Sequence, residues 1–579
     1  MKVEQNYQQL NIKQIQPKCE NKITQNKVSY KSNPNFTGWV DMGLRFLDTN
    51  PAWGADVVDL CFMVTPRTLT DFGRGADAGI ETMRREGMGT ANHSAVPLYG
   101  TLAGLAFAMG INGLYGLNEK GKVKASSVFA DSETLDMMGK IYDKELKYAQ
   151  SKPGANPLRS FLTKYFGSYE ALSPSENAKY IKADDLDIKR VVDILEQEIK
   201  ADGNKPAKDA MATARAIITS SLGGAENNLR IIANDGEKLH TSRYTVDTII
   251  ENAYKLGKIF TTEKVKEAFI SAEHYTENAF INAMKSMNMK RSLAGIGIAS
   301  AVGVSTQPLN MYLTKKKTGK SGFVGGGEED KSTGFKLKKL AAGLAFLAGV
   351  FSTIENPKKL IKEPKSLINA LQFKGFNPTI KQFKFIYGIT IFSRFLSSRN
   401  DNELKETSIK DTLGFINWLI LGNFVQKLVA QGLDKDLIKK DGDGIMKWIT
   451  GSVLKSRDEI LHASLGKKVF KNGKALSYNE MVKLADKATK IKLRKLSIAQ
   501  IINYAYSGLV LGVGIPKLNI YLTGRREAKK AERLAKSGQQ PQTQNGVISS
   551  TGALKNEDIM LAPANIRFLN KTGVDFLNN

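Results

Sequence analysis

The stretch that decides the fold is residues 95–117, AVPLYGTLAGLAFAMGINGLYGL, in which no side chain carries a charge. A helix rises 1.5 Å per residue, so about 20 residues cross the roughly 30 Å of a bilayer's hydrocarbon core. The stretch has 23 residues and is therefore long enough to cross a membrane as one helix. We interpret it as the first membrane helix of the chain.

Other apolar stretches extend this interpretation. Lys427 interrupts one of them, and residues 385–393 are too short to cross a membrane alone. Core helices of a large soluble protein can also be apolar all round, and that alternative stays open here. The pattern favours an all-α fold and a polytopic helical membrane protein. The stretches are residues 292–314, 340–354, 385–393, 412–433 and 496–516.

Small residues recur four positions apart in these stretches. Because helices and lipid tails are equally apolar, membrane helices associate where small side chains let their backbones approach closely. Glycine costs about 1 kcal/mol relative to alanine in a soluble helix, so its abundance favours close packing in a bilayer. We predict helix packing at three such pairs: Gly100 and Gly104, Ala299 and Gly303, and Ala345 and Gly349.

Two segments of the chain share a motif. Residues 303–314 read GVSTQPLNMYLT and residues 512–523 read GVGIPKLNIYLT, and seven of the twelve positions are identical. Both segments follow an apolar stretch and lead into a basic one. The identical pairs are Gly303 and Gly512, Val304 and Val513, Leu309 and Leu518, Asn310 and Asn519, Tyr312 and Tyr521, Leu313 and Leu522, and Thr314 and Thr523.

A weaker echo links residues 50–69 to residues 377–396. Each segment begins with Asn-Pro and ends in Arg-x-Leu, with the arginines at Arg67 and Arg394. Together the two likenesses predict two related halves in parallel, the first of which carries an insert at 118–290.

The predicted insert is polar and helical. Apolar side chains in residues 185–199 and 244–259 follow the spacing of one helix face. We therefore expect a soluble helical bundle, because sustained strand alternation is scarce along the chain.

Basic residues follow both copies of the shared motif. The positive-inside rule counts Lys and Arg in short loops beside membrane helices, so we predict that both motif exits are cytoplasmic. This arrangement needs a crossing at 385–396, and it places 118–291 and 434–495 on the other side. We expect the basic residues to contact anionic lipid headgroups. They are Lys315, Lys316 and Lys317 after the first copy, and Arg525, Arg526, Lys529 and Lys530 after the second.

Composition limits the partners. Lys and Arg number 84 against 57 Asp and Glu, and the formal net charge of +27 favours anionic partners. Membrane lipids are the partners we expect, and nucleic acid is disfavoured. Cys19 and Cys61 alone cannot form a disulfide framework, which excludes a stapled secreted miniprotein. A mean hydropathy of −0.27 argues against a polytopic protein with minimal loops.

The predicted organisation follows these landmarks along the chain. The polar composition of both ends predicts disordered tails. The segments are a polar tail at 1–38, a membrane-proximal region with the first apolar helix at 39–117, the insert at 118–290, an apolar helix with the motif at 291–314, a basic and Gly-rich linker at 315–339, second-half apolar helices at 340–433, a polar Lys-rich region at 434–495, an apolar helix with the motif at 496–523, and a basic then disordered tail at 524–579.

Motifs for chemistry are missing from the sequence. It contains no HExxH, CxxC or GxSxG pattern, and its four histidines are scattered, so we assign no catalytic, cofactor-binding or metal-binding residue. The mixed-charge stretch 70–86 could form a charged gate, but an exposed helix or loop with weak ion pairs is favoured. The apolar stretches hold no carboxylate, the usual mark of ion coupling.

These observations predict a multi-pass protein of the cell membrane. We expect a non-enzymatic membrane scaffold or interaction protein. A transporter or channel is the first alternative, because duplicated helical halves are a common transporter plan. The second is a soluble basic helical protein that binds membrane surfaces or nucleic acid.

Overall fold

The structure is a computed structural model, and it describes most of the chain. The predicted tails fall largely outside the described residues, although Thr37 already begins a helix and residues 524–536 continue one. The described residues are 37–49, 51–73, 75–173, 180–232, 244–319, 329–421, 423–439, 448, 452–471 and 474–536.

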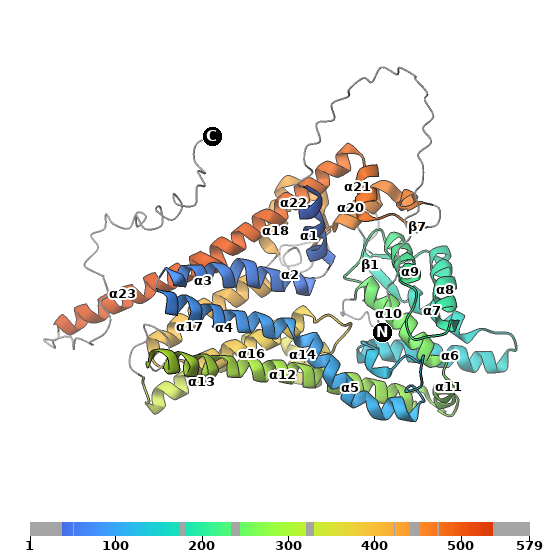
Figure 1. Ribbon diagram of the computed structural model, residues 1–579, viewed down its shortest axis with the longest axis horizontal. Helices are drawn as coiled ribbons and strands as arrows, with labels where there is room; N and C mark the ends of the chain where they lie inside the picture. Colours follow the sequence, from blue (N-terminus) through green and yellow to red (C-terminus); the bar gives the residue numbers. More distant parts are fainter. Residues whose placement is uncertain are drawn as a thin grey trace, which may run out of the picture.

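The described chain is mostly helical, which confirms the coarse prediction of an all-α fold. Long helices lie side by side in a bundle, and a globular head sits at one end of it (Figure 1). The bundle contains α1 (Thr37–Thr49), α2 (Pro51–Val57), η1 (Val58–Val64), α3 (Thr65–Phe72), α4 (Ala76–Ser94), α5 (Val96–Leu114), α12 (Ala279–Thr318), α13 (Thr333–Ile354), α14 (Pro357–Lys362), α15 (Lys365–Ala370), α16 (Ile380–Ser397), α17 (Asp401–Phe415), η4 (Ile416–Ile420), α18 (Phe424–Leu433), α22 (Lys487–Ser507), η7 (Gly508–Gly514) and α23 (Ile515–Lys536).

The head is built from two segments that are distant in the sequence. The first follows α5 and has its own apolar core, and the second follows α18. The first contains η2 (Ala125–Ser127), α6 (Ser132–Ser151), α7 (Pro157–Gly167), β1 (Tyr169–Leu172), β2 (Tyr180–Lys182), α8 (Asp185–Lys200), α9 (Lys208–Ser221), β3 (Arg230–Ile231), α10 (Val246–Phe260), α11 (Glu263–Ile270) and η3 (Tyr275–Glu277). The second contains η5 (Lys435–Leu437), β4 (Ile438–Lys439), β5 (Val453–Leu454), α20 (Arg457–Leu465), η6 (Gly466–Val469), β6 (Phe470–Lys471), β7 (Lys474–Ala475) and α21 (Tyr478–Leu484).

The head also contains short strands that the sequence did not indicate. They form an antiparallel sheet in the order β2-β1-β3 and two hairpins, β4-β5 and β6-β7. Each strand has two to four residues, which is too short for an alternating pattern to stand out. The predicted apolar stripe of residues 185–199 forms the buried face of α8.

Within the described residues, two helices are long and apolar enough to cross a membrane, and up to four segments are if each bent pair counts as one span. The two helices are Thr333–Ile354 and Lys487–Arg526. The bent pairs are Ala76–Ser94 with Val96–Leu114, bent by 45°, and Asp401–Ile420 with Phe424–Leu433, bent by 47°. Neither α12 nor α16 meets that test, because polar residues lower their mean hydropathy.

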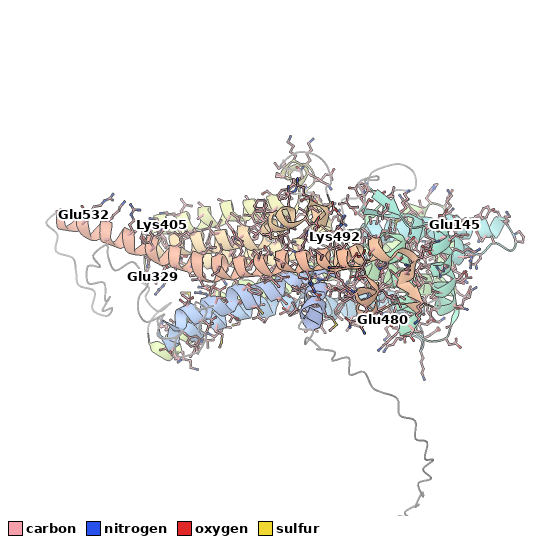
Figure 2. The ribbon with its side chains drawn as sticks, turned by 90° about the horizontal axis from the view of Figure 1, so that it is seen from above. Glu145, Glu329, Lys405, Glu480, Lys492 and Glu532 are labelled. Carbon is pink, nitrogen blue, oxygen red and sulfur yellow. The ribbon has the colours of Figure 1, made fainter. Side chains whose placement is uncertain are left out.

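Labelled charged residues mark the two ends of the molecule. Seen from above, Glu329, Lys405 and Glu532 lie at the end remote from the head, whereas Glu145 and Glu480 lie on the head (Figure 2). The C-terminal ends of α12 and α23 both point to the remote end (Figure 1). Both motif exits therefore leave the bundle at one end, and both head segments leave it at the other.

Candidate functional site: a buried charge cluster in the bundle

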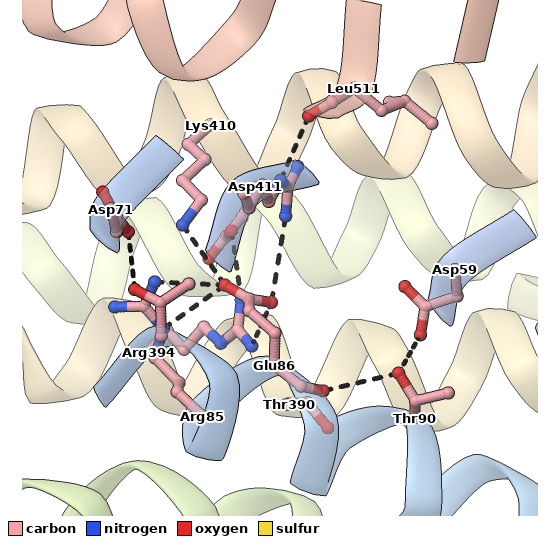
Figure 3. Close-up of polar contacts among 12 residues, drawn as sticks. Asp59, Asp71, Arg85, Glu86, Thr90, Thr390, Arg394, Lys410, Asp411 and Leu511 are labelled. Carbon is pink, nitrogen blue, oxygen red and sulfur yellow. Dashed lines mark hydrogen bonds and ion pairs between the residues drawn. The ribbon is translucent and has the colours of Figure 1, made fainter. Parts of the chain in front are cut away.

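Six charged residues from four helices meet inside the bundle (Figure 3). Glu86 of α4 is at the centre, and cationic side chains of α3, α4, α16 and α17 surround its carboxylate. We call this set the charge cluster: Arg67, Arg85, Glu86, Arg394, Lys410 and Asp411.

Four cations contact the one carboxylate of Glu86. Its Oε1 lies 3.1 Å from Arg85 Nη2 and 3.2 Å from Lys410 Nζ. Its Oε2 lies 3.2 Å from Arg394 Nη2 and 3.8 Å from Arg67 Nη1. The Glu86 side chain is almost completely buried, so these ion pairs are shielded from water.

Two arginines tie the cluster to other helices. Arg394 Nη1 lies 3.2 Å from Asp411 Oδ1, and Arg67 Nε donates to the backbone oxygen of Leu511 in η7 at 3.1 Å. Arg67 is fully buried, and its Nη1 and Nη2 atoms make no hydrogen bond with another described residue. The Nη2 atom lies against Gly414, where an added Cβ would come within 3.3 Å. Arg67 therefore depends on Glu86 and on the η7 backbone.

The sequence prediction for residues 70–86 was wrong at its C-terminal end. Glu86 is not on an exposed surface, and the favoured alternative of weak surface ion pairs does not describe it. The carboxylates of the cluster lie outside the uncharged stretches, and for this reason the search of those stretches missed them. The signal was present in the weaker echo, because Glu86 follows Arg67 by nineteen residues and Asp411 follows Arg394 by seventeen.

The two copies of the shared motif lie in matching environments. Leu309 and Leu518 are 42% and 43% exposed, and Tyr312 and Tyr521 are 61% and 59% exposed. The two asparagines are buried. Asn310 Oδ1 accepts from Arg84 Nε of α4, and Asn519 Nδ2 donates to the Glu406 backbone oxygen of α17 at 3.2 Å.

The remaining motif positions differ in burial between the two copies at some pairs and match at others. Thr314 is buried and accepts from Arg84 Nη2 at 3.0 Å, whereas Thr523 is half-buried. The leucines at 313 and 522 are half-buried. Val304 is exposed and Val513 is half-buried, and each faces outward more than the buried glycine before it.

Of the three predicted small-residue pairs, two lie at helix contacts. An added Cβ on Gly303 would lie 2.3 Å from Thr390 Oγ1, and Ala299 is fully buried beside it in sequence. Gly100 packs against the ring of Phe373, and Gly104 packs against the Arg291 side chain.

The third pair, Ala345 and Gly349, faces away from the bundle. Both residues are exposed, and no atom lies within 4 Å of an added Cβ on Gly349. On the same helix it is Gly343 that packs, against Phe392 of α16. The spacing of the small residues on α13 could therefore not tell which face of the helix is inside.

The basic residues after the motifs continue the helices. Lys315, Lys316 and Lys317 belong to the last turn of α12 and are exposed, and Lys317 Nζ lies 2.8 Å from Asp77 Oδ1. Arg525, Arg526, Lys529 and Lys530 belong to α23, where Arg525 and Lys529 are exposed and Arg526 is half-buried. The contact of these residues with lipid headgroups stays a prediction.

Irregular helix geometry surrounds the charge cluster. The π-helical segments η1 and η7 interrupt the helices α2–α3 and α22–α23, and they pack against each other. At Gly512 of η7 an added Cβ would lie 2.5 Å from Pro66, so only glycine allows this approach. Segments of π-helix inside longer helices occur often at functional sites.

Known proteins give no guide to the role of this cluster. No group of three or more His, Cys, Asp or Glu residues in the described chain could hold a metal ion. Comparison with protein-family models, with curated proteins and with solved structures finds no match in any of the three.

Proposed function

We propose that this chain is an integral membrane protein of two related halves, and that the charge cluster serves transport of an ionic solute. The predicted transporter alternative thus takes precedence over the predicted scaffold. The observation that carries the proposal is the burial of Glu86 and Asp411 among cations between candidate spans. Ionisable residues inside a membrane are costly, and they mark ion or substrate pathways by default.

The proposal of two halves is supported by corresponding contacts. In each half a helix carrying the cluster arginine is followed by a bent pair, then by a head segment, and then by a helix with the shared motif. The motif helix α12 packs against α16, and the motif segment η7 packs against η1 and α3. Each motif glycine therefore contacts the arginine-bearing segment of the other half. Duplicated halves around a central site are a recurring transporter plan.

The cluster lies where the halves meet. Arg67 and Glu86 come from the first half, and Arg394 and Asp411 come from the second. A relative motion of the halves would exchange the partners of Glu86, because it is bound by cations of both. Such an exchange is the expected basis of alternating access.

The membrane orientation is supported by the distribution of charge. The basic motif exits lie at the end remote from the head, and we propose that this end is cytoplasmic. The two head segments then lie together on the other side. We propose that α12 and α16 also cross, shielded by the more apolar helices around them.

Flux measurements on proteoliposomes test transport. We expect wild-type protein to give solid-supported-membrane currents with one of four solute classes: inorganic ions, carboxylates, amino acids or cationic amines. Glu86→Gln removes the charge that four cations share and should abolish the current. Glu263→Gln, an exposed head variant, is the control. Equal currents from Glu86→Gln and wild type would show that the charge cluster takes no part in transport.

The predicted scaffold role is the second candidate function. The head favours it, because the head has its own apolar cores and carries exposed apolar side chains such as Leu186 of α8, 72% exposed. A photo-crosslinking amino acid at Leu186 should then capture a discrete protein in native membranes. The same probe at Lys205, a polar head site, is the matched control. Vesicles without flux in any solute class, together with a specific crosslink at Leu186, would favour the scaffold.

A further inference from the structure

Two buried carboxylates stand next to the charge cluster but do not belong to it. Asp56 of α2 and Asp59 of η1 are three positions apart, so they share one face of the helix. They are only 6% and 2% exposed. Both face α4: Ser94 Oγ donates to Asp56 Oδ2 at 3.0 Å, and Thr90 Oγ1 donates to Asp59 Oδ2 at 2.5 Å. Figure 3 shows the contact between Asp59 and Thr90.

The second oxygen of each carboxylate has no partner. Asp56 Oδ1 and Asp59 Oδ1 are buried and make no hydrogen bond within the described chain. Neither residue forms an ion pair with a cation of the described segments. Two buried carboxylates without a counter-ion cost several kcal/mol, so the site as it stands lacks a positive charge.

The charged residues nearby do not supply that charge. Arg67 of α3 attracts the Asp59 carboxylate, but Glu86 of α4 and Asp56 both repel it. Arg67 is also engaged with Glu86 and with the η7 backbone. The hydrogen bonds of the two carboxylates come from the hydroxyls of Thr90 and Ser94 on α4.

The hydroxyls can serve as ligands as well as donors. Ser94 Oγ lies 3.1 Å from the Thr90 backbone oxygen, and Thr90 Oγ1 lies 3.4 Å from the Glu86 backbone oxygen. Each hydroxyl can therefore donate its proton to its own helix and direct a lone pair at a bound cation. Carboxylate and hydroxyl oxygens are hard ligands, and hard ligands suit small cations that prefer oxygen.

We propose that Asp56, Asp59, Thr90 and Ser94 form a binding site for one small monovalent cation, either Na⁺ or H⁺. The inference rests on the proposed function, in which this cation is the coupling ion of transport. The four side chains come from α2, η1 and α4, and they offer carboxylate and hydroxyl oxygens as ligands. Loading it changes the charge beside Arg67, and through Arg67 it affects Glu86. Cation binding would thereby bias the pairing in the charge cluster.

The test measures binding to the purified full chain in detergent. The unfolding temperature is followed as NaCl replaces choline chloride at constant ionic strength, and the infrared absorption of protonated carboxyl groups is recorded near neutral pH. For a sodium site we expect a concentration-dependent rise of the unfolding temperature. The rise should be lost in Asp56→Asn and Asp59→Asn. For a proton site we expect no sodium effect and a protonated-carboxyl band that Asp59→Asn removes.

Controls keep the result independent of folding defects. Thr90→Val and Ser94→Ala leave both carboxylates in place and should weaken the sodium effect. Asp77→Asn changes an exposed carboxylate on the same helix and should leave both readouts unchanged. The proposal is overturned if wild type shows neither a sodium-dependent shift nor a protonated carboxyl that Asp56→Asn or Asp59→Asn removes.

The outcome separates this inference from the proposed function. Cation binding in detergent without flux in vesicles would overturn transport alone. Flux that requires Glu86, without cation binding at Asp56 and Asp59, would overturn this site alone.

Discussion

At the residue scale, the unusual feature is that four cationic side chains contact the single carboxylate of Glu86. Removing Glu86 would leave Arg67, Arg85, Arg394 and Lys410 close together without the carboxylate that all four contact. Breaking a buried ion pair by removing one partner costs about 3–5 kcal/mol, because the other charge stays buried and uncompensated. Glu86 therefore contributes to stability as well as to the proposed transport.

The first prediction concerns the stability of that cluster. Glu86→Ala should lower the free energy of unfolding by about 3–5 kcal/mol, measured by thermal or denaturant unfolding in detergent. Glu263→Gln is the control, because the Glu263 side chain is 80% exposed and its ion pair with Lys266 should contribute less than about 1 kcal/mol. Equal stability of the two variants would show that the charge cluster does not stabilise the fold.

The second prediction concerns pH and the head. Arg45 of α1 binds both Asp458 of α20, at 2.7 Å, and Glu226, at 3.3 Å, and thereby joins the two head segments. Burial, together with the nearby Asp458 carboxylate, raises the pKa of Glu226 from 4.5 to about 7. Between these pH values the folded state keeps a proton that the unfolded state has lost. The stabilisation is complete below pH 4.5 and is lost as pH rises to about 7.

The variant Glu226→Gln should not lose this stabilisation as pH rises, because its side chain carries no titrating carboxyl group. The free energy of unfolding of wild type relative to Glu226→Gln should fall between pH 4.5 and about 7, by on the order of a few kcal/mol. Unfolding curves across this pH range measure the difference. Glu267→Gln, an exposed carboxyl of the same head, should keep the wild-type pH dependence. An identical pH profile for Glu226→Gln and wild type would contradict the prediction.

At the element scale, glycines separate helix contacts from open helix faces. Gly303 and Gly349 carry the same small-residue spacing, but only Gly303 touches another helix. Gly303→Ala should cost about 1–3 kcal/mol, because the added methyl group collides with the buried Thr390. Gly349→Ala should be neutral or stabilising by up to about 1 kcal/mol. Unfolding in detergent measures both, and equal effects would place α12 and α16 farther apart than described.

The sequence predicted where helices lie along the chain better than it predicted which face of a helix is buried or where a helix bends. Uncharged stretches at 340–354 and 496–516 indicated helices that are long and apolar enough to cross a membrane. The bend between α4 and α5 has a visible cause in Pro97, which cannot donate a backbone hydrogen bond. The π-helical geometry of η1 has no comparable signal, because it depends on packing against η7, more than 400 residues later.

The candidate site was missed for a related reason. The sequence of α4 alone is that of a polar helix. Its residues are buried because α3, α16 and α17 pack against it. The partners of Glu86 include Arg394 and Lys410, which are more than 300 residues away in the sequence. Only the weak echo at Arg67 and Arg394 pointed to a common site.

At the scale of the whole molecule, the first question is whether the bundle lies in lipid. Alkaline carbonate should leave the protein in the membrane pellet, because up to four segments are apolar and long enough to span. Release into the supernatant would favour the soluble alternative, a basic protein bound to the membrane surface.

Cysteine labelling tests the orientation. Single cysteines at Lys316 and Arg525, in a chain without Cys19 and Cys61, should react with an impermeant reagent from one side of the membrane. A cysteine at Asp202, exposed on the head, should react from the opposite side. Labelling of all three from one side would reject the proposed topology.

The divided head has a consequence for synthesis. The chain leaves the ribosome from its N-terminus, so Arg45 and Glu226 emerge long before Asp458, which completes their contact. The early segment can form its own core, but its interface with the late segment stays uncovered until nearly the whole polypeptide has been translated. The assembled head can therefore form only after both of its segments have been made.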